Sequence, residues 1–468
     1  MILSCASFLS SAVALPIRAF ASLIGRLVHS PKAQTFFLER SKNHFKEQLR
    51  LAKNFQTQSK ERLKQTTFWL HVSSAGELEQ VIPVMRSLHQ QLAIYFFVTY
   101  FSPSTKPFLK NCPGLIGSVS LPAEDRSSYS QIINELGIDR LLLVRYDFWP
   151  ALIHTAQKNR VPIAVLAATL ERARSILPNR LQTLSKLFWF KQADLLFLVS
   201  EADKTRLIDL DFSPEVAVVS GDAKWARAME RAQNQKRQIH ATPLTAVLAH
   251  LTQHTNYVKR KTLVFGSPHK EELLVLRWCL KNLSVPCLFV VAPAEVDEKA
   301  ISQLEWTLED GGAQTLRLSV LEQSLESLPP VAHDRPIVLI LDSFGQLAAA
   351  YGCADCAIVG GGFDGQLHNV LEPAAYPVLT LFGNRTTRAP EAQILLDHNA
   401  AISFVQPETM FDFLRRWSSL NSGGGGEHTD CPDFEHTLAD AQKLFGSLPN
   451  TSEVICRAIA ERHKLEIN

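Results

Sequence analysis

Short apolar runs alternate with amphipathic segments along the chain from residue 67 onward. In the first stretch these runs read FWLHV, IYFFVTY, GSVSLP, RLLLVRY, PIAVLAA, LLFLVS and VAVVSG. Segments with apolar residues at helical spacing separate several of them, for example ELEQVIPVMRSLHQQL and FWPALIHTAQKNR. Strands that alternate with helices are typical of a parallel sheet that is covered by helices on both faces. The pattern therefore predicts an α/β domain.

The alternation pauses after Gly221, where the chain is polar and mostly helical in character, and it restarts near residue 262. The later apolar runs read TLVFGS, CLFVVAPA, AQTLRLSV, PIVLILDS, CAIVGGG and YPVLTLFG. We expect two Rossmann-like domains, at 67–225 and 262–468, joined by a helical connector at 226–261. A last helix is expected to close the second domain. Because ligands of such sheets bind at the carboxyl ends of strands, the pattern predicts a site in a cleft that the two domains face.

Composition supports a folded protein with two cores. The chain has 468 residues, of which 46% are hydrophobic and 20% are charged, and this length exceeds what one ordinary core supports. The net charge of +2 gives no global field that would favour nucleic acid. The eight cysteines form no dense framework, which indicates a reduced, cytosolic body. Cys353 and Cys356 have redox or metal spacing, but as a single pair before an apolar run they are better explained by core packing.

The N-terminal segment differs in charge from the rest of the chain. Residues 1–70 contain eleven Lys or Arg and three Glu, a net charge of +8, which leaves about −6 on the remainder. The uncharged apolar run before Arg18 is shorter than the roughly 20 residues of a membrane span. No basic region precedes it, unlike in a signal peptide. We therefore expect 1–66 to be a basic arm with a membrane-associated helix, and a buried packing helix is the alternative.

Glu77 stands just after the first predicted strand, in the stretch FWLHVSSAGELEQV. Ser74 and Glu77 have the S-x-x-E spacing of a capping box, in which the glutamate accepts from a free backbone N–H. A carboxylate at the carboxyl edge of a strand is also placed to take a proton from an attacking hydroxyl. The helix dipole lowers the pKa of such a carboxylate, which opposes the second role. The residues alone favour the capping role.

A glycine run marks a second candidate segment, AIVGGGFDGQLHNVLEPAAYP. Glycines let a ligand approach the backbone, and free N–H groups at a helix start attract phosphate. Asn369 and Glu372 have the N-x-x-E spacing of a capping pair. The segment therefore favours a nucleotide or sugar cradle, and its candidate residues are Gly360, Gly361, Gly362, His368, Asn369 and Glu372.

Two further segments follow predicted strands. In VFGSPHKEEL, Ser267 is predicted to cap a helix with Pro268 at its first position, and the same groups could meet a phosphate. In LLLVRYDFWPALI, Arg145 and Asp147 either pair with each other at a strand end or present Arg145 to a substrate. No HExxH motif or paired CxxC motif is present, so no metal site is predicted.

In this order, these segments resemble the 3-deoxy-D-manno-octulosonic-acid (Kdo) transferases of lipopolysaccharide synthesis in Gram-negative bacteria. The resemblance covers about residues 67–404. HVSSAGE is similar to H-x-x-S-x-G-E, LVRYDFWPALI to an M-E-T-E-L-W-P-N-L-like stretch, and VVSGDAKW to V-T-G-N-x-K-F. VFGSPHKEE is similar to A-x-S-T-H-x-G-E-E, the run LDSFGQLAAAYGCADCAIVGGGF to D-T-x-G-E-L with A-D-x-x-F-x-G-G-S, and LHNVLEPAAY to G-H-N-x-L-E-P-A.

The resemblance implies a GT-B fold and an inverting, metal-independent transfer of Kdo from CMP-Kdo to a lipid A precursor. It places the enzyme at the cytoplasmic face of the inner membrane, without a cofactor beyond the donor substrate. It implies that Glu77 is the general base and that Ser267, His368, Asn369 and Glu372 lie near the CMP moiety. The substrate-binding residues expected on this basis are Ser74, Gly76, Arg145, Asp147, Lys224, Ser267, Gly361, Gly362, His368, Asn369 and Glu372.

Several positions depart from the family pattern. Arg145 replaces the first glutamate of the M-E-T-E stretch and Asp147 the second, while Thr169 replaces an arginine. Where the family has a basic P-R-H-P-E-R stretch, this chain has acids at Glu295, Asp297 and Glu298, and Gln366-Leu367 replaces the glycine pair before His368. The alternatives are therefore a relative with altered sugar or lipid specificity, a non-catalytic membrane-bound scaffold, or a nucleotide-sugar epimerase.

Overall fold

The computed structural model describes most of the chain from residue 40 onward. The described residues are 40, 42–57, 66–121, 125–145, 147–170, 179–238, 243–253, 261–283, 287–323, 335–343, 345–376, 378–387, 389–419 and 434–466. The predicted membrane-associated helix falls in 1–39 and lies outside them. Within the described ranges, no helix combines the length and apolar character that a membrane crossing requires.

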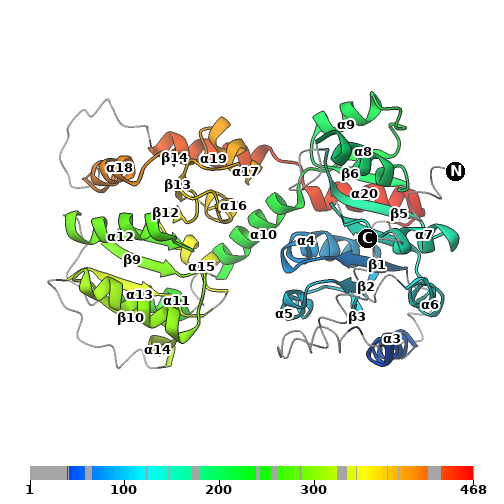
Figure 1. The fold of residues 1–468 in the computed structure, drawn as a ribbon, viewed down its shortest axis with the longest axis horizontal. Helices are drawn as coiled ribbons and strands as arrows, with labels where there is room; N and C mark the ends of the chain where they lie inside the picture. Colours follow the sequence, from blue (N-terminus) through cyan, green and yellow to red (C-terminus); the bar gives the residue numbers. More distant parts are fainter. Residues whose placement is uncertain are drawn as a thin grey trace. The chain divides into compact units, whose positions relative to one another are not determined.

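The chain divides into two compact units, each built on a seven-stranded parallel sheet (Figure 1). Unit 1 comprises Met1–Arg227 and Pro449–Asn468, and unit 2 comprises Ala228–Leu448. The strand order is β3-β2-β1-β4-β5-β6-β7 in unit 1 and β10-β11-β9-β8-β12-β13-β14 in unit 2. The predicted pair of Rossmann-like α/β sheets is therefore present.

Unit 1 contains strands that are almost continuously apolar, as expected for parallel strands with helices on both faces. The strands are β1 (Thr67–Val72), β2 (Tyr95–Tyr100), β3 (Leu115–Ser120), β4 (Arg140–Val144), β5 (Ile163–Ala168), β6 (Leu195–Leu198) and β7 (Ala217–Val219). The helices are α3 (Lys42–Thr57), α4 (Ala75–Leu92), α5 (Lys106–Leu109), α6 (Arg126–Leu136), α7 (Pro150–Lys158), α8 (Asn179–Phe190), α9 (Glu201–Ile208) and α20 (Thr451–His463), with a 3₁₀ turn η2 (Pro103–Thr105).

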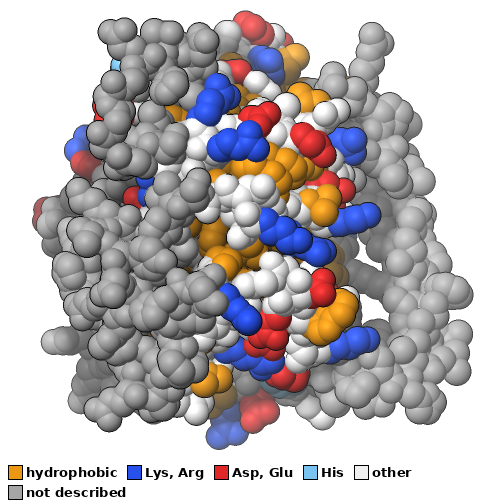
Figure 2. Space-filling view, turned by 90° about the vertical axis from the view of Figure 1, so that its left-hand side faces the viewer, with side chains coloured by type: hydrophobic (Ala, Val, Ile, Leu, Met, Phe, Trp, Pro, Cys, Tyr) orange, Lys and Arg blue, Asp and Glu red, His pale blue; other side chains and the backbone are white. Residues whose placement is uncertain are grey.

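Unit 2 repeats the alternation. Its strands are β8 (Lys261–Gly266), β9 (Cys287–Ala292), β10 (Gln314–Arg317), β11 (Ile337–Ile340), β12 (Cys356–Val359), β13 (Leu379–Gly383) and β14 (Ile402–Phe404). Its helices are α11 (Pro243–Gln253), α12 (Lys270–Asn282), α13 (Glu298–Asp310), α14 (Leu318–Gln323), α15 (Leu347–Gly352), α16 (Leu371–Ala374), α17 (Pro390–Asp397), α18 (Pro407–Ser419) and α19 (Phe434–Ser447). On the face of unit 2 that Figure 2 shows, basic and acidic side chains are interspersed with apolar ones, so no single sign of charge dominates its described part.

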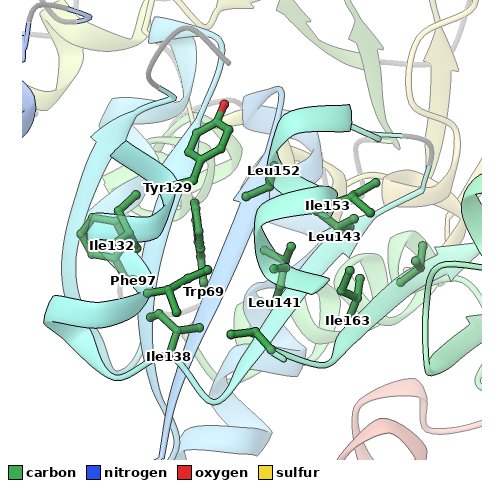
Figure 3. Close-up of a cluster of buried hydrophobic side chains, with 14 of the residues drawn as sticks. Trp69, Phe97, Tyr129, Ile132, Ile138, Leu141, Leu143, Leu152, Ile153 and Ile163 are labelled. Carbon is green, nitrogen blue, oxygen red and sulfur yellow. The ribbon is translucent and has the colours of Figure 1, made fainter. Parts of the chain in front are cut away.

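Successive side chains of β1 point to opposite faces of the first sheet and fill two separate cores. Trp69 packs on one face with residues of β4, β5, α6 and α7, among them Tyr129 and Leu152 (Figure 3). Phe68 and Leu70 pack on the other face with α4 and α20. In unit 2, Cys356 is fully buried in the core, as the sequence predicts for this cysteine.

The last helix, α20, belongs to unit 1, whereas we expected it to close the second domain. Ile455 and Ile459 are buried against the core that α4 covers, and Cys456 Sγ lies 3.3 Å from Gln91 Oε1 of α4. The amphipathic pattern of α20 shows that it has a face to bury, but it does not show which domain supplies the matching surface.

The segment predicted as a connector also differs. Helix α10 (Ala223–Gln238) begins in unit 1 and continues into unit 2. Helix α11 buries Leu244, Val247 and Leu251 in a core of unit 2. The polar residues of 226–261 masked this apolar stripe, so most of the predicted connector is an integral part of the second unit.

We expect Ile459→Ala to lower the free energy of unfolding of unit 1 by about 2–5 kcal/mol, because it leaves a cavity between α20 and α4. The matched control is Glu461→Ala on the exposed side of the same helix, which should change it by less than about 0.5 kcal/mol. Chemical denaturation followed by tryptophan fluorescence measures both. Equal, small effects would show that α20 does not stabilise unit 1.

Candidate functional site

The strand order of each sheet reverses at one place, between β1 and β4 in unit 1 and between β8 and β12 in unit 2. At such a point the loops after the two strands leave in opposite directions and open a crevice, which is where ligands of open α/β sheets bind. All four candidate segments follow these strands: 73–77, 145–149, 267–272 and 360–368. We call the first two segments the first site and the last two the second site. The cleft between domains stays a prediction.

Glu77 caps helix α4, as its spacing predicts. Ser74 Oγ accepts a hydrogen bond from Glu77 N at 3.3 Å, and Glu77 Oε2 accepts from Ser73 N at 2.6 Å. The glutamate thus reaches one residue further back than in the usual capping box. Gly76 lies exposed beside it, and the only atom within 4 Å of a Cβ added there is Ser74 Oγ. Oε2 of Glu77 serves the cap, and Oε1 has no hydrogen-bond partner within the described residues.

The pKa of Glu77 is nevertheless raised above the ordinary value of 4.5. Burial is the largest cause, and the negative charge of Asp147 adds to it. The backbone N–H of Ser73 and the imidazole of His71 act in the opposite direction without cancelling the rise. The expectation that the helix start would depress this pKa is therefore wrong, because burial and a second carboxylate outweigh the helix start.

Asp147 is an ionised carboxylate held by two hydrogen-bond donors and a neighbouring imidazole. Ser73 Oγ donates to Oδ2 at 2.5 Å, and Trp149 Nε1 donates to Oδ1 at 2.9 Å. His71 Nε2 lies 2.9 Å from Oδ2, as a close contact rather than an aligned hydrogen bond. Burial alone would raise the pKa of Asp147, but the nearby imidazole of His71 and the two donors bring it below its usual range. Arg145 was the alternative partner of Asp147, and the structure gives Asp147 other ones.

A buried threonine fixes the protonation of His71. Thr99 Oγ1 accepts from Trp69 Nε1 at 2.9 Å and lies 2.8 Å from His71 Nδ1. Since the hydroxyl proton of Thr99 needs an acceptor and Trp69 offers none, Thr99 donates to Nδ1. His71 therefore carries its proton on Nε2, facing Asp147. The sequence alone does not assign roles to His71 and Thr99. They lie on β1 and β2, and only the pairing of these two strands brings their side chains together.

Arg145 forms an ion pair with Asp222, with 2.7 Å between Nη2 and Oδ2. Arg145 Nε also donates to Gln80 Oε1 of α4 at 3.3 Å. Asp222 Oδ1 accepts from Lys224 N at 2.9 Å, so the same carboxylate caps α10. Asp222 stands where the family pattern has asparagine and Arg145 where it has glutamate, so the two departures compensate each other in charge.

Two other departures also have local partners. Thr169 is buried, and Nζ of the buried Lys186 lies 3.5 Å from its carbonyl oxygen, so a cation reaches the place where the pattern has arginine. In the acidic stretch, Asp297 caps α13 by accepting from Ala300 N at 3.1 Å, and Glu298 lies 2.9 Å from Arg317. These two acids therefore stabilise α13 and its neighbour.

In the second site, helix α12 begins two residues later than predicted. Its N-cap is His269, and Glu272 Oε2 accepts from His269 N at 2.9 Å. Ser267 is therefore not the cap; it has a φ of +51° and its N–H donates to Ala292 O at 2.7 Å. Glu272 is fully buried, and burial raises its pKa against the pull of backbone donors at His269 and Gly361.

The glycine run has a packing reason. A Cβ on Gly360 would lie 1.9 Å from Ser267 O, and one on Gly362 would lie 2.4 Å from Gly383 N. Gly361 has a φ of +80°, and its carbonyl accepts from Gln366 N at 2.7 Å. The glycines thus let the loop after β12 lie directly against the segments after β8 and β13.

This packing brings two histidines and a carboxylate together. His269 Nδ1 lies 2.7 Å from Asp364 Oδ2, and His269 Nε2 lies 3.2 Å from His368 Nε2. Their rings are nearly perpendicular. His368 was a predicted site residue, whereas His269 and Asp364 were not, because nothing in their sequence separation of 95 residues indicates contact.

Asn369 and Glu372 do not form the predicted capping pair. Asn369 Oδ1 accepts from Leu371 N at 3.0 Å, which caps the short helix α16. Glu372 instead forms a short ion pair with Arg231 of α10. Within the described residues, no group of three or more His, Cys, Asp or Glu side chains is arranged to hold a metal ion.

Comparison with known proteins follows the same division of the chain. The model of the family described as 3-deoxy-D-manno-octulosonic-acid transferase (kdotransferase) matches residues 43–227. A 3-deoxy-D-manno-octulosonic acid transferase of Rickettsia typhi is 22% identical over 364 residues, which cover 76% of this chain and 73% of that protein. Residues 43–227 thus match the Kdo transferase family, and the similarity to a named transferase of this kind extends over 76% of the chain.

Two further proteins show how far the similarity extends along the chain. A bifunctional glycosyltransferase/methyltransferase of Fusobacterium nucleatum is 24% identical over 68% of this Kdo transferase homologue, and the match spans about half (47%) of that protein's length. A UDP-GlcNAc 2-epimerase from Neisseria meningitidis, solved with UDP-GlcNAc, superposes with a TM-score of 0.56 and 13% identity, covering 85% of this chain and 100% of that one. This second likeness establishes a GT-B-like fold alone.

We expect Arg145→Glu to destabilise unit 1 by about 2–4 kcal/mol, because it removes a half-buried ion pair and places two carboxylates together. Adding Asp222→Asn restores the family pattern, removes the repulsion and keeps a good N-cap. The double variant should therefore recover at least half of the loss. Chemical denaturation of both single variants and the double variant measures this coupling. Strictly additive effects would contradict the compensating exchange.

Proposed function

We propose that this protein transfers Kdo from CMP-Kdo to a lipid A precursor, with inversion and without a metal ion, at the cytoplasmic face of the inner membrane. The match to the family model supports the class of reaction. The donor and the acceptor are taken from the family resemblance, and the relative from Rickettsia typhi is named a 3-deoxy-D-manno-octulosonic acid transferase. Glu77 is the proposed base.

The observation that carries the proposal is the pairing of Glu77 with Asp147 at the first site. Burial and the charge of Asp147 raise the pKa of Glu77, which makes its carboxylate a stronger base than that of a free glutamate. Oε2 holds the start of α4, which leaves Oε1 to accept the proton of the acceptor hydroxyl. Asp147 is ionised because His71, Ser73 and Trp149 satisfy it, so its charge supports the proton affinity of Glu77.

The donor is assigned to the second site. Ser267, His368, Gly361 and Gly362 lie in the two segments that follow β8 and β12, where the strand order reverses. Glu372 and Asn369 follow in the same loop, with Glu372 held by Arg231. The departing nucleoside monophosphate bears its charge on phosphate, which N–H donors can stabilise without a cation.

Helix α3 supports membrane association of the basic arm 1–66. Its buried side, including Phe45 and Leu49, packs on unit 1. Its exposed side presents basic side chains at Lys46, Arg50 and Lys53. Basic side chains next to a membrane attract anionic lipid headgroups, and the acceptor is an anionic lipid.

Altered specificity is the second candidate function. This chain has Arg145 and Asp222 where the family pattern has glutamate and asparagine. It has Thr169, with Lys186 nearby, where the pattern has arginine. These replacements change the charges around the first site. A different lipid or sugar would meet these groups. The scaffold and the epimerase are outcomes of the same test, because a scaffold forms no product and an epimerase needs no acceptor.

We expect Glu77→Gln to reduce Kdo transfer at least about 100-fold, because the amide retains an oxygen for the cap but cannot take a proton. The assay follows transfer from CMP-Kdo to a tetra-acylated lipid A precursor in detergent with EDTA. The matched control is Glu79→Gln, which makes the same change two residues along α4 and should keep activity.

Turnover of Glu77→Gln at the wild-type rate would leave Glu77 as a helix cap only. Loss of wild-type activity in EDTA would contradict metal-independent transfer. A folded wild type without transfer would favour altered specificity, and other activated sugars and acceptors would then be tested.

The pH profile offers an independent check on Asp147. Glu77 must be ionised to act, so kcat/KM should fall as pH decreases through its raised pKa. Asp147→Asn removes the neighbouring negative charge and should move this acidic limb to lower pH. Glu79→Gln should leave the limb in place. A limb that does not move in Asp147→Asn would show that Asp147 does not influence the base.

A further inference from the structure

The two histidines of the second site share a proton position. Their Nε2 atoms are 3.2 Å apart, and neither two lone pairs nor two N–H groups can face each other at that distance. One ring therefore donates to the other. Asp364 Oδ2 lies 2.7 Å from His269 Nδ1, which places a proton on that nitrogen.

These constraints define two states. In the neutral pair, His269 Nε2 accepts from His368 Nε2–H, and His368 Nδ1 is left with a lone pair. When the pair gains one proton, either His368 becomes cationic or His269 does and donates back to His368. In both cases His368 Nδ1 carries a proton. One added proton thus converts the outer nitrogen of His368 from an acceptor into a donor.

Phosphate oxygens accept hydrogen bonds, so they bind only the second state. We propose that His269 and His368, held by Asp364, form a one-proton relay that takes up a proton to bind the phosphate of the departing nucleoside monophosphate. This inference rests on the proposed nucleotide-sugar donor. His368 is exposed, and its Nδ1 has no hydrogen-bond partner among the described residues.

The electrostatic surroundings agree with uptake on binding. Burial and the charge of His269 lower the pKa of His368, and Asp364 acts in the opposite direction. Burial thus disfavours a positive charge on His368, and a bound anion would oppose this effect. The other charged residues beside it are the buried Glu272 of α12 and Arg385, whose N–H donates to Gly362 O.

The relay fits the charge balance of glycosyl transfer. As the bond between the sugar carbon and the phosphate oxygen breaks, its electron pair passes to that oxygen, which gains negative charge. The acceptor hydroxyl binds the sugar carbon and gives its proton to Glu77. The relay proton stays on imidazole and donates to the new phosphate oxygen.

The test is calorimetric titration of the full chain in detergent with CMP at pH 6.5, 7.5 and 8.5. We expect about tenfold tighter binding at pH 6.5 than at pH 8.5, with proton uptake shown by buffers of different ionisation enthalpy. Cytidine, which lacks the phosphate, should show no such dependence. The same titration with inorganic phosphate tests whether phosphate without the nucleoside is sufficient for the pH-dependent binding.

Variants assign the effect. His368→Gln should abolish the pH dependence, and Asp364→Asn should move it to lower pH because the cation loses its partner. His398→Gln, directly after α17 and outside the cluster, is the control and should match the wild type. Wild-type CMP binding that does not change with pH, or a His368→Gln variant that keeps the dependence, would overturn the relay.

The outcome separates the relay from the proposed function. pH-dependent CMP binding without Kdo transfer would retain the relay and remove the donor assignment. Kdo transfer together with CMP binding that does not depend on pH would retain the donor assignment and remove the relay. If CMP does not bind, pH-dependent binding of inorganic phosphate supports the relay, and its absence overturns it.

Discussion

Parallel strands end at one edge of a sheet, and the strand order of an open sheet reverses at one place. This constraint decides where chemistry is possible here. Most side chains of the strands are apolar and buried, so the predicted site residues follow β1, β4, β8 and β12 instead of lying within them. The two candidate sites therefore occupy equivalent positions in two sheets of different sequence.

At the first site the same carboxylate can cap a helix and act as a base. The cap uses Oε2 of Glu77, and burial together with Asp147 raises the pKa of the group. Asp147 stays ionised because a chain of donors leads back through His71 to Thr99 and Trp69. A fixed, ionised neighbour is what distinguishes this glutamate from an ordinary capping residue.

The departures from the family pattern occur with compensating partners. Arg145 meets Asp222, and the buried Lys186 reaches Thr169. A cation buried without a partner is costly, so a charge reversal persists only where a second change accompanies it. Such paired changes preserve the fold and alter the charges that a substrate meets, which fits a shift in specificity within the Kdo transferase family.

The sequence by itself determined the two α/β halves, the described strands except the short β14, the cap at Glu77 and the four loops that carry polar groups. These follow from periodicity and from residues three or four positions apart. Only the tertiary structure decided that α20 packs on α4, that Arg145 pairs with Asp222, and that His269 meets Asp364 and His368. Periodicity shows that a helix has an apolar face without naming its partner surface. A short polar side chain likewise has many possible partners until distant strand ends are brought to one edge.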